Sequence, residues 1–231
     1  MSVSRVTPQS IQAGLGKRKL PIIMLIDTSS SMSGLGIQQV NINLKEYIEN
    51  LKNMPDLHGD IDLSIVTFNS SVDVLAEFVP LDTFTPPTLH TAASTDLASG
   101  IEAVIRLIDQ KRAVYYDQYK RTLFVLISDG NPDPGNQWKQ AISKMNADHY
   151  LEKAIRIALG AGTDNAIDDT TLQAFIKNPE TDRAVRITDM RDFRDFMKYL
   201  TTVSREASKG KAISTPRQAG VQDSVQVVSG Q

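Results

Sequence analysis

The 231-residue sequence contains no cysteine. Disulfide bonds, thiolate catalysis and cysteine-ligated zinc are therefore excluded. Long apolar runs are also missing, since none approaches the ~20 residues of a membrane-spanning helix. The run Leu20–Ile26 follows three basic residues and superficially resembles a targeting signal, but it is short and contains Pro21. We interpret it as a buried strand, and we expect a cytoplasmic protein without a membrane partner.

Neither sign of charge is in excess. The 25 Lys and Arg residues nearly balance the 27 Asp and Glu residues, leaving a formal net charge of −2. Such a chain lacks the basic footprint that nucleic-acid binding requires, so we expect no nucleic-acid partner. The length and the 41% hydrophobic content suit one globular α/β domain with flanking tails.

Strands and helices alternate along the sequence. Continuous apolar runs at Leu20–Ile26 and Leu123–Ile127 are typical of central parallel strands that are covered on both faces. Alternating patterns predict four further strands: Ile61–Ile65, Val72–Phe78, Ile155–Leu159 and Ala184–Thr188. Val72–Phe78 follows Ile61–Ile65 after a short turn, so we expect a hairpin whose second strand is an antiparallel edge strand. Apolar residues at spacings of three and four predict helices, less clearly for the last two: Ile37–Leu51, Leu97–Ile108, Phe193–Val203, Trp138–Ala147 and Leu172–Ile176.

This order predicts a doubly wound α/β fold with a mostly parallel sheet, one antiparallel edge strand and helices on both faces. We expect an N-terminal arm over residues 1–18, the domain over residues 19–207 and a disordered tail over residues 208–231, where apolar periodicity stops. The tail offers Ser214 and Thr215 as candidate phosphorylation sites, and a plain linker is the alternative.

Polar residues with oxygen ligands follow the predicted strands. Asp27, Ser29 and Ser31 come directly after the first strand, Thr95 opens a helix, and Asp129 ends the run Leu123–Ile127. In open α/β sheets, ligands bind at the carboxyl ends of the strands where strand order reverses, and the order 3-2-1-4-5-6 would bring these residues to one edge. Two carboxylates and three hydroxyls form an all-oxygen set suited to Mg²⁺ or Mn²⁺. Because the hydroxyls are neutral, an open position on the cation should favour an incoming carboxylate.

The segment from Asp27 to Ser33, with Thr95 and Asp129, resembles the metal-ion-dependent adhesion site of von Willebrand factor A domains. This resemblance covers roughly residues 19–204. It implies that Ser29, Ser31 and Thr95 approach the metal, while Asp27 and Asp129 act through water. It also implies an adaptor or scaffold without catalysis, whose protein partner contributes an Asp or Glu.

The stretches Leu81–Leu89 and Ile127–Pro134 are similar to the bacterial TerY-like subgroup, which is linked to tellurium resistance and stress responses. This similarity implies an associated kinase and phosphatase as partners. The sequence departs from the family pattern at Ser30 and at Ala93-Ser94, where glycines are common.

Three alternatives stay open. The serines after the first strand could cap a helix. A haloacid-dehalogenase-like phosphohydrolase would use Asp27 as its nucleophile, although Ser29 occupies the position of that family's second acid, and a serine hydroxyl is no general acid near neutral pH. Finally, the chain could be a metal-free structural interaction domain. We expect no catalytic residues.

Overall fold

The computed structural model describes residues 17–92, 94–161, 168–178, 182–187, 190–211 and 226–227. The candidate phosphorylation sites Ser214 and Thr215, most of the arm and most of the tail lie outside these ranges. Within them, no helix is long and apolar enough to cross a membrane.

One sheet organises the chain, with strands in the order β3-β2-β1-β4-β5-β6-β7. The strands are β1 (Leu20–Asp27), β2 (Ile61–Phe68), β3 (Val72–Pro80), β4 (Leu123–Ser128), β5 (Ile155–Ala161), β6 (Arg183–Ile187) and β7 (Gln226–Val227). The helices are α2 (Leu35–Lys52), α3 (Leu97–Gln110), α4 (Arg112–Gln118), α5 (Trp138–Ala147), α6 (Asp169–Phe175) and α7 (Met190–Ser208), with 3-10 turns η1 (Ser30–Met32), η2 (Pro55–Leu57) and η3 (Leu81–Thr83). The predicted doubly wound architecture is confirmed, with the order reversing between β1 and β4.

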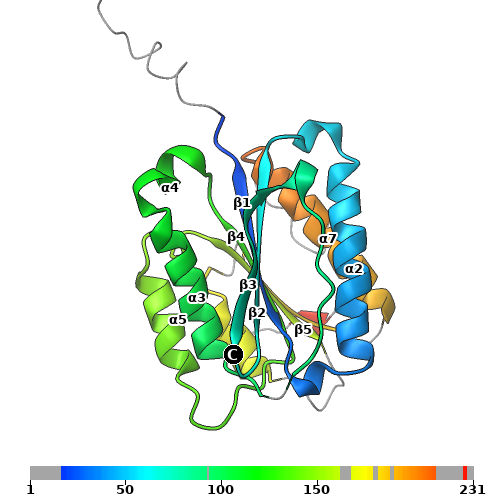
Figure 1. Cartoon of the computed structure of the whole chain (residues 1–231), viewed down its shortest axis with the longest axis vertical. Coiled ribbons are helices and arrows are strands. Elements are labelled where there is room, and N and C mark those ends of the chain that lie inside the picture. The colour runs from blue at the N-terminus through cyan, green and yellow to red at the C-terminus, as the bar shows by residue number, and fades with distance from the viewer. Residues whose placement is uncertain are drawn as a thin grey trace, which may run out of the picture.

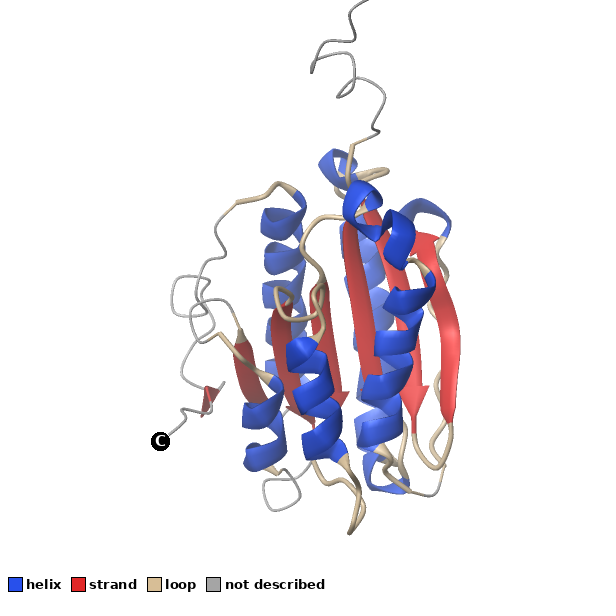
Figure 2. Ribbon diagram, turned by 90° about the vertical axis from the view of Figure 1, so that its left-hand side faces the viewer, coloured by secondary structure: helices blue, strands red, loops and turns tan. Residues whose placement is uncertain are grey.

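The sheet is parallel from β2 through β6, and β3 pairs antiparallel with β2. Asn69 makes the hairpin turn, because its side chain accepts a hydrogen bond from the Ser71 N–H at 2.9 Å. A second antiparallel pair, which the sequence did not predict, lies at the other edge. There Gln226 and Val227, inside the predicted tail, pair with β6 (Figure 2).

Successive side chains of β1 point to opposite faces of the sheet and enter separate cores. Ile22 and Met24 join the core under α2 and α7, whereas Ile23 and Leu25 join the core under α3, α5 and α6. Figure 1 shows these two helical layers on either side of the strands. Burial on both faces explains why β1 is apolar throughout.

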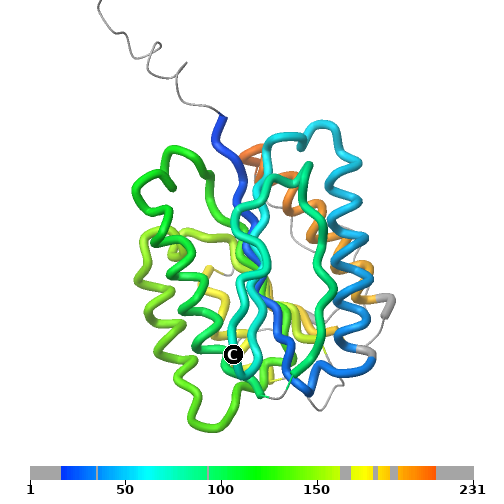
Figure 3. Tube along the Cα trace, in the orientation of Figure 1, coloured from blue at the N-terminus to red at the C-terminus, as the bar shows by residue number. Residues whose placement is uncertain are grey.

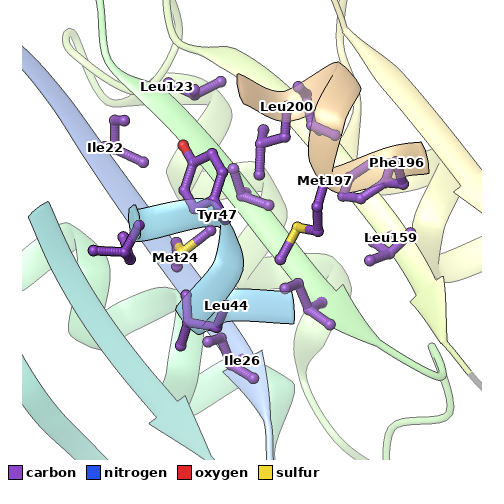
Figure 4. Close-up of a cluster of buried hydrophobic side chains, with 14 of the residues drawn as sticks. Ile22, Met24, Ile26, Leu44, Tyr47, Leu123, Leu159, Phe196, Met197 and Leu200 are labelled. Carbon is purple, nitrogen blue, oxygen red and sulfur yellow. The ribbon is translucent and has the colours of Figure 1, made fainter. Parts of the chain in front are cut away.

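A buried polar contact joins the two helices of one layer. The Tyr47 hydroxyl on α2 lies 2.7 Å from the Ser204 hydroxyl on α7, within a core that includes Met24, Met197 and Leu200 (Figure 4). The contact satisfies two hydroxyls that would be costly to bury alone. It adds a buried polar link between α2 and α7 within this apolar core.

Helix α4 was not predicted from the sequence. Of its seven residues only Tyr115 is buried, while Val114 and Tyr116 are exposed. A single buried side chain gives no apolar periodicity, so the pattern that revealed the longer helices is missing here.

The connection from β3 to α3 runs the length of the molecule beside α2 (Figure 3). Asn41 of α2 holds it, because its amide donates to the Leu89 carbonyl at 2.9 Å and its amide oxygen accepts from the Leu89 N–H at 2.8 Å. This path carries the chain from the amino edge of the sheet to the carboxyl edge, where Thr95 lies.

Candidate functional site

The carboxyl ends of β1 and β4 lie side by side. The two strands are parallel and Ile26 is in register with Ile127, so Asp27 stands opposite Ser128 and Asp129 follows. The Ser128 hydroxyl donates to Asp27 Oδ2 at 2.6 Å. Two residues distant in sequence are thus joined at the point where the strand order reverses.

Asp27 is fully buried. Its Oδ1 accepts a hydrogen bond from the Ser29 N–H at 2.8 Å, and its Oδ2 accepts the bond from Ser128. Burial raises the pKa of Asp27 to about 6, although the hydrogen bonds from Ser128 and Ser29 oppose this, and the negative charge of Asp129 raises it further.

Asp129 is 1% exposed, and its two oxygens differ. Oδ1 accepts a hydrogen bond from the Asn131 N–H at 3.1 Å, whereas Oδ2 has no hydrogen-bond partner. In the described part of the chain, no Lys, Arg or His forms an ion pair with Asp129 or Asp27. A buried carboxylate oxygen without a partner is expensive, and a cation or an ordered water at Asp129 Oδ2 would offset that cost.

The loop after β4 makes a close approach to the start of α6. Gly130 has φ +81°, and a Cβ built there would lie 2.6 Å from the Asp168 carbonyl oxygen. The Gly130 N–H donates to the Ser128 hydroxyl, and the Asp168 N–H donates to the Asp129 carbonyl, both at 2.9 Å. These contacts hold Asp129 in place.

Ser29 and Ser31 present adjacent hydroxyls, with their Oγ atoms 2.9 Å apart. Ser29 occupies the N-cap position of η1, but its side chain makes no capping hydrogen bond. The capping interpretation is therefore wrong for Ser29. Ser29 is buried and Ser31 is exposed, so the pair reaches from the sheet edge to the surface.

Thr95 is buried at the same edge. Neighbouring residues anchor its segment, because Ala92 forms a bridge with Ser29 and the Asp96 N–H donates to the Asn69 carbonyl at 2.9 Å. The Thr95 carbonyl accepts from the Asp133 N–H at 3.0 Å. Among the described residues, no hydrogen bond joins the Thr95 hydroxyl to Asp27, Ser29, Ser31 or Asp129.

Residues without a role in the sequence prediction support this edge. Asp96 caps α3 by accepting from the Ser99 N–H at 3.1 Å, and it also accepts from the Asn136 side chain at 2.7 Å. Partial burial acts to raise the pKa of Asp96, but these hydrogen bonds hold it below its usual value. Of these supporting residues, Ser128 could most easily have been found from the sequence, because it is a hydroxyl residue at a predicted strand end beside an aspartate.

The donor set consists of two carboxylates and neighbouring hydroxyls. Within the described ranges, no group of three or more His, Cys, Asp or Glu side chains that could hold a metal ion is present. A cation at this edge would therefore depend on hydroxyl oxygens in addition to the two carboxylates, a donor set of the kind that hard cations take.

Comparison with known proteins identifies the family of this fold. The family model of the von Willebrand factor type A domain matches residues 22–199. No curated protein matches the chain in sequence.

Solved structures show the same fold. The minor pilin PilB from Streptococcus sanguinis has a TM-score of 0.63 at 12% identity, with 87% of this chain and 64% of that chain covered. The pilus adhesin SpaC from Lactobacillus rhamnosus GG has a TM-score of 0.62 at 10% identity, covering 84% of this chain and 30% of that one. A von Willebrand factor type A protein from Catenulispora acidiphila has a TM-score of 0.58 at 13% identity, covering 81% and 43%. This chain thus spans less than half the length of the last two proteins.

Proposed function

The chain belongs to the von Willebrand factor type A domain family, and on that premise we propose that it holds a Mg²⁺ or Mn²⁺ ion and uses it to bind an acidic group of a partner protein. Domains of this family typically serve in protein interaction or adhesion and are generally non-catalytic. The metal, its ligands and the acidic partner are our own inference.

One observation carries the proposal. Asp27 and Asp129 are buried together at adjacent strand ends, no basic side chain of the described chain neutralises them, and Asp129 Oδ2 has no partner. Burying a carboxylate without a compensating charge costs several kcal/mol. A divalent cation would offset that cost for both groups, and oxygen donors are the ligands that Mg²⁺ prefers.

The chain's own residues would divide the work. Ser29, Ser31 and Thr95 would offer hydroxyl oxygens to the ion, and Asp27 and Asp129 would orient its waters, as the resemblance implies. Ser128 and the Ser29 N–H keep Asp27 in position. When bound, the cation supplies a positive charge with an exchangeable position, which favours a carboxylate from outside.

Calorimetry with Mg²⁺ and Mn²⁺ tests the metal site. The wild-type chain should bind one ion, and Asp129→Ala should abolish binding while the thermal unfolding transition stays cooperative. Asp133→Ala is the matched control, because Asp133 is an exposed acid at the same edge. Undiminished affinity in Asp129→Ala would reject the ligand assignment, and a wild-type chain that binds no ion would favour the metal-free interaction domain.

Capture of the partner tests the mechanism. In a pull-down from native cells, the partner should bind in Mg²⁺, be released by chelator and return when Mg²⁺ is restored. Asp27→Ala should abolish capture without unfolding the domain. A partner held equally well in chelator, and by Asp27→Ala, would show that another surface binds it.

Our proposal for the cellular role rests on the TerY-like resemblance alone. We propose a cytoplasmic role in a bacterial stress or tellurium-resistance system, with a kinase and a phosphatase among the partners. We do not propose a phosphohydrolase, because Ser29 stands where that family's second acid would be. Mass spectrometry of the captured proteins tests the partners, and assays on small phosphoesters should detect no activity.

A further inference from the structure

A hollow of about 270 Å³ lies at the amino ends of the central strands. It is lined by residues of α4 and by residues just before β4 and β5. With eight residues in β1 at about 3.3 Å each, this edge is roughly 25 Å from the candidate metal site. In Figure 1, α4 marks this end of the molecule and the start of α2 marks the other. The two sites are therefore independent surfaces.

Aromatic rings line this hollow. Tyr115 and Tyr119 are almost fully buried, with ring centroids 4.9 Å apart, and the Tyr150 ring lies 4.8 Å from that of Tyr115. Their hydroxyls are already engaged, in order, with the Thr122 hydroxyl, the Asp62 carboxylate and the Arg112 carbonyl. Because Tyr115 and Tyr119 are buried, the ring surface that remains for a ligand belongs to the half-buried Tyr150 and the exposed Tyr116.

Phe78 supports this cluster from β3. Its ring stacks on Tyr119 at 5.1 Å and meets Tyr115 edge-on at 5.9 Å. Phe78 has φ +45°, which a bulky residue adopts only when its surroundings enforce it. The Ser64 hydroxyl helps to enforce it by accepting the Phe78 N–H at 2.9 Å. The aromatic cluster is thus fixed by the fold.

Positive charge surrounds the rings. Four cationic side chains line the hollow, and no Asp or Glu is among the described residues that line it. Lys120 and Arg121 already donate to backbone carbonyls. Arg18 lies over the ring of the exposed Tyr116 at 5.5 Å, and neither Arg18 nor Lys153 forms an ion pair with a described residue. Since the whole chain has a net charge of −2, this positive region is a local feature.

We propose that this hollow binds a phosphate group carried near an aromatic ring, the chemistry shared by a nucleotide and a phosphotyrosine side chain. The ring of the ligand would stack on Tyr116 or on Tyr150, as bases stack on aromatic side chains. Arg18 and Lys153 would bind the phosphate, for which the guanidinium fork is especially suited. A bare phosphate would leave the rings unused, and an uncharged ring would leave the cations unpaired.

Calorimetry on the full chain tests this proposal with two probes, AMP and phosphotyrosine. Adenosine, tyrosine and inorganic phosphate are the matched controls. At least one probe should bind at least tenfold more tightly than its dephosphorylated form and than inorganic phosphate. The tighter of the two probes identifies the source of the phosphorylated ring.

Variants locate the binding. Arg18→Ala combined with Lys153→Ala, and separately Tyr116→Ala, should each weaken binding at least tenfold, and these exposed positions should tolerate substitution. Lys45→Ala, an exposed lysine on α2, should have no effect. Asp129→Ala should also have none, which separates this site from the proposed metal site. No binding of either probe, equal binding of inorganic phosphate, or unchanged affinity in both site variants would overturn the proposal.

Discussion

Asp27 is a weaker acid than an ordinary aspartate, because its carboxyl group is buried beside Asp129. Between about pH 4 and pH 6, the native state therefore holds a proton on Asp27 that the unfolded chain has already released. In chelator, the free energy of unfolding should therefore decrease as pH rises from about 4 to about 6, and this contribution should level off above pH 6. A shift from 3.8 to about 6 corresponds to roughly 3 kcal/mol.

Urea denaturation at a series of pH values measures this effect. Other carboxyl groups titrate in the same range, so the comparison is with Asp27→Asn, which removes the titration and keeps the shape. The difference in free energy of unfolding between the two proteins should change across this window. A constant difference would mean that Asp27 titrates alike in both states.

Gly130 is required by two features at once, a positive φ and the nearby Asp168 carbonyl. Gly130→Ala should cost at least about 2 kcal/mol of stability, because the added Cβ strains the backbone and meets that oxygen. Gly135→Ala is the matched control, since Gly135 has φ +82° with no atom within 4 Å of the added Cβ. Thermal denaturation of both variants separates the effect of the clash with Asp168 from that of backbone strain. Equal losses of stability in the two variants would show that the clash at residue 130 is relieved.

At the scale of elements, the connection between β3 and α3 decides where Thr95 lies. Asn41→Ala removes both hydrogen bonds that attach Leu89 to α2, which should lower the free energy of unfolding by about 1–2 kcal/mol. If the connection positions Thr95 for the cation, Mg²⁺ affinity should also fall severalfold by calorimetry.

The control for this variant is Gln38→Ala, at an exposed position of the same helix. It should change neither stability nor affinity appreciably. A loss of stability in Asn41→Ala with unchanged Mg²⁺ affinity would mean that the connection serves the fold and that Thr95 does not depend on it.

At the scale of the whole molecule, the described core is complete before the tail begins. Its last buried hydrophobic residue is Ala207, and β7 pairs with β6 over only two residues. Deletion of residues 212–231 should therefore change the free energy of unfolding by less than about 1 kcal/mol, measured by urea denaturation. A large loss would show that β7 stabilises the β6 edge. Ser214 and Thr215 stay predictions that mass spectrometry of native protein would test.

The sequence by itself determined the elements and the local part of the site. Burial on both faces forces strands such as β1 and β4 to be apolar throughout, and one buried face gives α2 and α3 their periodicity. Asp27, Ser29 and Ser31 belong to one loop, so their proximity follows from the chain itself. Helix α4 was not predicted because it has a single buried side chain. Strand β7 was not predicted because it pairs over only two residues.

Only the tertiary structure decided which strand ends meet. Strand pairing depends on how both faces of the sheet are covered, and residue patterns do not specify it. The prediction of the site therefore assumed the strand order 3-2-1-4-5-6, and the structure has this order. The contact of Asp27 with Ser128, the unpaired oxygen of Asp129 and the path that brings Thr95 to this edge all depend on it. The aromatic hollow at the opposite edge is a further product of assembly, because its rings and cations come from segments that no local pattern connects.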